Sequence, residues 1–321
     1  MQKRILSTFL VLFLGIIMCA AQTDRTAIYS LLEDLNKAEQ DTTKVNVLNK
    51  LAKEFSLTDI NKSIEYSRQA IVIAKKTNYY DGLSLGYLNI SKSFYYQYEF
   101  DSIVYYYNLN EGIAPKVSKW EIEASFDNIL GLIHHIQSDY PKAISFYKKS
   151  LKTRVSYSDK SGTIYCYNNI GAAFYDQGNY EKALENYFKS LAISEEIKDS
   201  LMIATTLANV GGVYEGQDKF ESALTFYKRA NKIAIEKNIE KSIADTYRNI
   251  GGIYAEKKQY DSSVYVFEQA LKVYKKTSNT RGEVSLYNIF GQFYVLYAES
   301  KKELDTELLN QALDYYNKGL E

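Results

Sequence analysis

Apolar and aromatic residues recur along most of the chain at the three- and four-residue spacings of amphipathic helices. In one representative stretch, the residues that share a helical face are Tyr167, Ile170, Gly171 and Phe174. A second set follows at the same spacings: Tyr180, Ala183, Leu184, Tyr187, Ser190 and Leu191. A polar segment, 176–179, separates the two sets. The pattern therefore predicts a hairpin of two helices joined by a short turn.

This hairpin repeats with a period of 40 residues. The same phase is occupied by Ser91, Gly131, Gly171, Gly211, Gly251 and Gly291. Relative to that phase, rings recur at +3, +9 and +16, and small residues at +12 and +19. A glycine inside a helix costs about 1 kcal/mol relative to alanine, so we expect the two helices to cross closely there, with the small residues facing the glycine. We expect Gly and Asn to supply the backbone freedom of the turns.

The arrangement resembles the tetratricopeptide repeat family. The run from Tyr167 to Phe174 matches the slots of that family's first helix, and the run from Tyr180 to Leu191 matches its second helix. The resemblance covers about residues 45–321. It implies an all-α fold, a right-handed superhelical solenoid of about seven helix-turn-helix repeats, in which each first helix lines a concave groove.

The two ends of the array differ from its middle. Residues 22–44 are expected to form an N-terminal covering helix, and the solenoid is expected to occupy 45–321. The last repeat carries an insertion of nine residues before Ala312, and no polar capping helix follows it. Repeat arrays need caps for solubility, so we expect either that the given sequence is truncated or that another segment, or a second copy, covers that end.

The first residues carry the pattern of an export signal. Lys3 and Arg4 precede an apolar run, 5–18, and small residues end at Ala21. This predicts a signal peptide over 1–21 and a periplasmic or extracytoplasmic location. A single N-terminal anchor helix is the alternative, although the run is shorter than a membrane span requires. Met18 before Cys19 disfavours a lipoprotein.

Composition and charge argue against several classes of protein. The 39 basic residues balance 39 acidic ones, which gives no basic surface for nucleic acid. Two His and two Cys leave little material for a zinc site, and only Cys166 follows the predicted signal peptide, so no internal disulfide is expected. We predict no metal and no cofactor. His134 and His135 point apart on a helix, and His134 fills an aromatic slot of the repeat.

No catalytic motif emerges from the sequence. Gly211 and Gly216 have the spacing of a phosphate-binding loop, but Gln217 and Asp218 stand where that loop needs Lys and Ser or Thr. The carboxylates are scattered over helical surface positions. We therefore predict that the protein is not an enzyme.

A binding surface is predicted from the resemblance. The asparagines two positions before the repeat phase would face the groove: Asn89, Asn169, Asn209 and Asn249. Such a series is similar to the asparagine ladders of kinesin light chains and of the O-linked N-acetylglucosamine transferase, where an amide can meet a peptide backbone. It is interrupted by Ile129 and Ile289. The alternative is that these amides bond neighbouring backbone within the array. Four tyrosines should also face inward, with packing as their alternative role: Tyr95, Tyr96, Tyr165 and Tyr175.

These observations favour an exported, non-catalytic scaffold that holds a protein or an extended peptide in its groove. The alternative is the extracytoplasmic sensory region of a histidine kinase or a transcriptional regulator whose output part lies beyond Glu321. We expect the protein to contact a membrane only through its N-terminal signal or through a membrane-spanning segment beyond the given residues.

Overall fold

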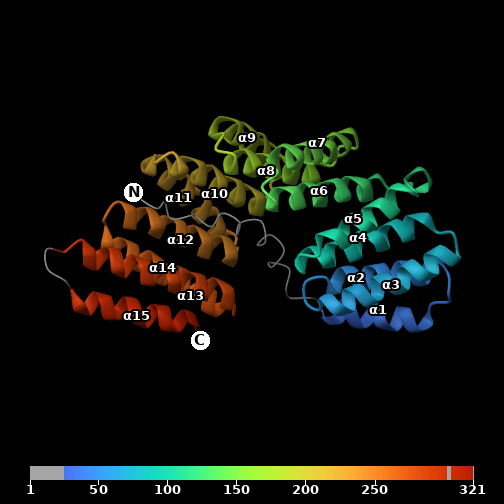
Figure 1. The fold of residues 1–321 in the computed structure, drawn as a ribbon, viewed down its shortest axis with the longest axis horizontal. Helices are drawn as coiled ribbons and strands as arrows, with labels where there is room; N and C mark the ends of the chain where they lie inside the picture. The colour runs from blue at the N-terminus through green and yellow to red at the C-terminus, as the bar shows by residue number, and fades with distance from the viewer. Residues whose placement is uncertain (1–24, 302–304, 321) are drawn as a thin grey trace. The chain divides into compact units, whose positions relative to one another are not determined.

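The computed structural model describes residues 25–301 and 305–320, and every regular element within them is helical, as the sequence predicts. The predicted signal peptide, 1–21, lies outside the described residues. Figure 1 labels the helices along the chain, which are α1 (Arg25–Lys37), α2 (Thr42–Phe55), α3 (Ile60–Lys76), α4 (Tyr80–Tyr96), α5 (Phe100–Glu111), η3 (Ala114–Lys116), α6 (Trp120–Ile136), α7 (Tyr140–Ser156), α8 (Lys160–Asp176), α9 (Tyr180–Glu196), α10 (Ser200–Gly216), α11 (Phe220–Glu236), α12 (Glu240–Glu256), α13 (Tyr260–Lys276), α14 (Thr280–Glu299) and α15 (Thr306–Leu320).

The turns between helices share one backbone geometry. Their middle residues have positive φ and recur at multiples of 20 positions: Asn78, Tyr98, Ser138, Ser158, Gly178, Lys198, Asp218, Asn238, Lys258 and Ser278. In the first of them, the N–H of Tyr79 donates to the oxygen of Ala74 at 3.0 Å, and the N–H of Asn78 donates to Lys75 at 3.4 Å. This pair of bonds is a Schellman motif, which satisfies the last carbonyls of a helix. The expectation of Gly and Asn was wrong for most of these turns, because hydrogen bonding holds other residue types in the left-handed region.

The residue after each left-handed position begins the next helix, often as its cap. Side chains at this position accept a hydrogen bond from the backbone N–H three residues on at Asp139, Asp159, Asn179, Asp199 and Asn279. Each such bond satisfies a donor that has no partner within the helix. One turn therefore ends one helix and starts the next within three residues.

The contacts divide the chain into two compact units, 1–177 and 178–321. In the first unit, α2 packs on α3, α4 on α5 and α6 on α7, and α8 follows against α7. In the second unit, α9 packs on α10, α10 on α11, α12 on α13 and α14 on α15. Helix α1 packs on α2, and its Leu35 contacts the core of the first unit.

The helices of a hairpin do cross closely at the repeat glycine. A Cβ built on Gly131 would lie 2.5 Å from the ring of Tyr147, and one on Gly251 would lie 2.5 Å from the ring of Phe267. Both rings are fully buried. The +16 ring therefore stands nearest to the glycine, which the sequence did not predict. The small +12 residue also faces it, as expected, because the hydroxyl of Ser263 donates to the oxygen of Gly251 at 2.8 Å. The small +19 residue Ser150 instead donates its hydroxyl to the oxygen of Ala124 at 2.7 Å.

The insertion in the last repeat lengthens its first helix. Helix α14 has 20 residues, whereas α12 has 17, and α15 begins only at Thr306. The hairpin contact survives this change, because the ring of Tyr316 lies 2.6 Å from where a Cβ on Gly291 would stand.

Candidate binding surface on the first helices

The first helices of successive hairpins lie against one another within each unit. Helix α4 contacts α2 and α6 in the first unit, and α10 contacts α12 in the second. We call the surface that these helices share the first-helix face. In the first unit we assign to it Lys92 of α4 and the two adjacent tyrosines one helical turn later, Tyr95 and Tyr96. Side chains from neighbouring helices can meet on this face.

The predicted ligand contact Asn89 is buried and is used within the array. Its Nδ2 donates to the backbone oxygen of Asn49 at 3.1 Å and lies 3.3 Å from the Oδ1 of Asn49. The Nδ2 of Asn49 donates in turn to the oxygen of Gly82 at 2.9 Å. The two amides therefore tie α2 to α4. The sequence prediction missed Asn49, although it stands 40 residues before Asn89.

Asn169 is buried in the same way. Its Nδ2 donates to the Oδ1 of Asn128 at 2.8 Å, which joins α8 to α6. Asn128 thus continues the series past Ile129. In the second unit, Asn209 and Asn249 keep part of their surface exposed, and the Oδ1 of Asn249 lies 3.5 Å from an Arg248 nitrogen. The two predicted asparagines of the first unit therefore join helices, and those of the second unit stay predicted ligand contacts.

The predicted tyrosines are partly exposed. Tyr95 and Tyr96 meet edge to face, with ring centroids 5.7 Å apart. Burial, with a smaller effect of Tyr98, raises the pKa of Tyr95 to about 12, and burial raises that of Tyr96 as well. Both phenols therefore stay neutral at physiological pH and can donate a hydrogen bond. Tyr165 and Tyr175 of α8 are also partly exposed.

Lys92 lies one turn before these tyrosines and was not predicted as a site residue. Its side chain is partly buried, and burial lowers its pKa to about 8. The charges of Lys53 and Arg154 lower it further. Within the part of the chain that the structure describes, no carboxylate pairs with its ammonium group. Lys92 is therefore a partly desolvated cation without a counter-ion.

The two adjacent histidines serve different contacts, as their spacing predicts. The ring of His134 stacks on Phe146 with centroids 5.4 Å apart, so it fills the aromatic slot as expected. His135 points to α8, where its Nε2 lies 2.7 Å from the Oδ2 of Asp176. Its Nδ1 lies 3.4 Å from the hydroxyl of Tyr147. No partner for His135 could be predicted, because Asp176 is 41 residues away in the sequence.

The second unit carries a charged cluster on its first helices. Asp245 accepts from Lys241 at 2.7 Å and from the Tyr274 hydroxyl at 2.8 Å, and Arg248 lies 3.9 Å from it. Burial pushes the pKa of Asp245 up, but the charges of Arg248 and Lys241 outweigh it and hold the pKa below its ordinary value. The cations of this cluster are thus already paired with a carboxylate, unlike Lys92.

With this geometry in view, the chain can be compared with known proteins. The sequence model of the tetratricopeptide repeat matches three overlapping segments, 122–196, 167–236 and 202–276. Together these segments cover residues 122–276, so this part of the chain matches the tetratricopeptide repeat model. No match was found among curated proteins.

Solved structures share the tetratricopeptide repeat architecture over more of the chain. A Rap protein complexed with competence and sporulation factor has a TM-score of 0.67 at 15% identity, covering 96% of this chain and 85% of its own. The Rap conjugation gene regulator of plasmid pLS20, in complex with the Phr* peptide, has a TM-score of 0.55 at 14% identity. The match covers 87% of this chain and 96% of the regulator. Aspartyl phosphate phosphatase F from Bacillus subtilis has a TM-score of 0.59 at 16% identity. The match covers 92% of this chain and 82% of the phosphatase. At these identities the likeness shows the fold alone.

Neither a metal site nor a membrane span is found in the part of the chain that the structure describes. Among residues 25–301 and 305–320, no group of three or more His, Cys, Asp or Glu side chains is placed to hold a metal ion. Over the same residues, no helix combines the length and the hydropathy that a membrane crossing requires. The first-helix face of the first unit, with Lys92 and the tyrosines, is therefore the candidate binding surface.

Proposed function

We propose that the protein is a non-catalytic scaffold that binds a protein or an extended peptide on the first-helix face of its first unit. The observation that carries this proposal is Lys92, a partly buried cation beside Tyr95 and Tyr96 that has no carboxylate partner among the described residues. Peptide complexes of two Rap proteins, which share the fold, support a peptide as the class of ligand.

The chemistry of the face favours an acidic group on that ligand. A buried cation without a counter-ion is costly, and a ligand carboxylate would remove that cost. Neutral phenols beside it can donate hydrogen bonds and cover apolar parts of the peptide. In the second unit, the equivalent attraction is weaker because Arg248 already has Asp245.

Selection from a random dodecapeptide library on the purified protein tests the proposal, followed by affinity measurements on variants. Lys92→Met is expected to lower the affinity for the selected peptides at least tenfold. The affinity of the wild-type protein is expected to fall as the pH rises through about 8, because Lys92 then loses its proton. Lys152→Met, an exposed lysine of α7, is the matched control and should change nothing. Equal affinity of wild type and Lys92→Met would overturn the site.

We also propose that the chain is exported by its first 21 residues. Lys3, Arg4 and the apolar run 5–18 before Ala21 motivate this proposal. Mass spectrometry of the protein from its native cells should find an N-terminus at Gln22 in an extracytoplasmic fraction. Full-length protein in the cytosol would contradict it.

A further inference from the structure

A pair of stacked rings recurs inside the hairpins of both units. One ring stands at +3 from the repeat phase on the first helix, and the other stands at +15 on the second helix, counted in the last hairpin without its nine inserted residues. In the first unit, the ring centroids are 6.0 Å apart in the pair Phe94–Tyr106 and 5.4 Å apart in His134–Phe146, with interplanar angles of 20° and 6°. In the second unit, the distances are 5.3 Å for Tyr214–Phe226 and 5.5 Å for Tyr294–Tyr315, with interplanar angles of 9° and 7°. In each pair the second-helix ring covers one face of the first-helix ring.

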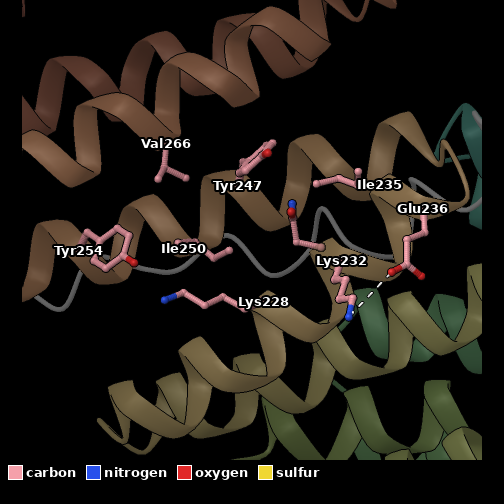
Figure 2. Close-up of a pocket in the computed structure, with 9 residues that line it drawn as sticks. Lys228, Lys232, Ile235, Glu236, Tyr247, Ile250, Tyr254 and Val266 are labelled. Atoms are coloured by element: carbon pink, nitrogen blue, oxygen red, sulfur yellow. Dashed lines mark ion pairs between the residues drawn. The ribbon is translucent and has the colours of Figure 1, made fainter.

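Two hairpins carry no ring at the second position: that of α8 and α9, which has Asn186 there, and that of α12 and α13. The hairpin of α12 and α13 lies within the second unit. Its first ring, Tyr254, is present, but the second position holds Val266. A pocket of about 470 Å³ opens at this place, lined by both residues, by Tyr247 and Ile250 of α12, and by α11. Figure 2 shows Val266 on α13 facing the α12 side chains. This aliphatic side chain stands at the sequence position where Phe226 stacks on Tyr214 in the preceding hairpin. Tyr254 thus lacks the aromatic partner of the other first-helix rings, and the ammonium group of Lys228 lies over its ring instead.

The rim of the pocket is positively charged. The Nζ of Lys228 lies 5.7 Å from the centroid of Tyr254, and none of the described carboxylates pairs with it. Lys232 lies 4.0 Å from Glu236, but both side chains are more than half exposed, so this ion pair is weak. Figure 2 shows both lysines reaching from α11 along one side of the pocket. An acidic ligand segment would complement this rim.

The groove between α3 and α5 shows what a complete ring pair does. There Tyr106 covers Phe94, and acidic residues, Glu99 and Asp101, join the lining. In that groove the first-helix ring is already covered, and the two carboxylates offset the charge of Arg68, which also lines it. The α11–α13 pocket differs in both respects.

We propose that the pocket lined by Tyr254 and Val266 is a second binding site, which takes an aromatic side chain flanked by carboxylates from a partner polypeptide. The ring would stack on Tyr254 as Phe226 stacks on Tyr214, and the flanking carboxylates would meet Lys228 and Lys232. Aromatic stacking and charge pairing of this kind are short-range and need no change in the helices. The site is independent of Lys92 and of the first-helix face.

Calorimetric titration tests this site with three acetylated, amidated pentapeptides. The first has a central phenylalanine between pairs of aspartates, the second has leucine in place of phenylalanine, and the third has lysines in place of the aspartates. We expect the first to bind at least tenfold more tightly than the other two. Val266→Phe, which restores the ring pair, should weaken its binding at least tenfold, and Lys92→Met should leave it unchanged.

Two further measurements keep the result decisive. Lys228→Gln, at an exposed position, should weaken the aspartate peptide severalfold without altering the circular dichroism spectrum, even where Val266→Phe folds poorly. Equal binding by wild type, Val266→Phe and Lys228→Gln would overturn the proposal. So would a dimer in sedimentation that Val266→Phe dissociates, because a second copy would then be the occupant.

Discussion

The side-chain amide of Asn89 donates to the backbone oxygen of Asn49 at 3.1 Å, from one first helix to the first helix of the preceding hairpin. The two residues stand 40 positions apart, which is one repeat. Both are almost fully buried, at 3% and 1% exposure. Burial and hydrogen bonding together make this asparagine series a connection between hairpins in the first unit.

Asn89→Ala should therefore destabilise the protein. It leaves the Asn49 Oδ1 without one donor and opens a small space, which together cost about 1–3 kcal/mol. Urea unfolding followed by circular dichroism measures the loss. Asn249→Ala, at a partly exposed position of the second unit, is the matched control and should stay within about 0.5 kcal/mol of wild type. Equal losses for the two variants would contradict a connecting role that is specific to the buried amide.

Two adjacent glycines of α12 should respond to alanine with opposite signs. A Cβ on Gly251 would lie 2.5 Å from the ring of Phe267, whereas a Cβ on Gly252 meets no neighbour within 4 Å. We expect Gly251→Ala to lose about 1–3 kcal/mol through the displaced ring. Gly252→Ala should gain about 0.5–1 kcal/mol, because alanine has the better helix propensity.

Thermal unfolding of both variants beside wild type measures this difference. Because the two positions share one helix and one substitution, any effect of helix propensity is common to both. A stabilised Gly251→Ala variant would show that the ring moves away at no cost.

The hairpin contacts could be predicted from the sequence because they depend on the 40-residue phase alone. The glycines at that phase and the rings at +16, such as Tyr147, recur often enough to mark a close crossing. The contacts of the site residues depend instead on which neighbouring helix each side chain meets. His135 finds Asp176 and Asn169 finds Asn128 across adjacent hairpins, at separations of 41 residues that no single-repeat pattern displays.

The turns show a second limit of the sequence. Their left-handed residues include Tyr98 and Lys258, which carry no intrinsic preference for positive φ. Hydrogen bonds of the two flanking helices impose the geometry, so residue type alone does not reveal it. The missing ring at Val266 had a visible signal, since the +15 position holds rings in four other hairpins, but its consequence needed the stacked geometry.

Lys258→Gly should stabilise the second unit. Lys258 is exposed and has a φ of 58°, which costs a residue with a Cβ about 1 kcal/mol. Glycine removes that cost. It also increases the conformational entropy of the unfolded chain, which offsets part of the gain, so a net stabilisation of about 0.5 kcal/mol is expected. The converse change, Gly178→Ala at a φ of 79°, should lose about 1 kcal/mol. Differential scanning calorimetry of both variants checks the pair, and a Lys258→Gly variant that melts below wild type would refute the expectation.

Asp127 should make the stability of the first unit depend on pH. It stands where other repeats have an aromatic or apolar residue, its side chain has no exposed surface, and Lys149 lies 3.1 Å from it. Burial raises the pKa of Asp127 to about 6, because the Lys149 charge does not fully compensate for the lost hydration. Below about pH 4 this carboxyl is protonated in both the folded and the unfolded chain. Between about pH 4 and 6 the folded state holds the extra proton, so stability falls as the pH rises through that window.

Asp127→Asn removes this titration and should raise the free energy of unfolding at pH 7.5 by as much as about 3 kcal/mol, the equivalent of two pKa units. The advantage should shrink towards zero near pH 4, where wild type is also neutral at this position. Urea unfolding at pH 4, 5, 6 and 7.5 measures it. Glu121→Gln removes an exposed carboxylate of the same helix and serves as the control, since it should leave the slope between pH 4 and 6 as in wild type. A parallel pH profile for wild type and Asp127→Asn would mean that Lys149 compensates fully for the burial of the carboxylate.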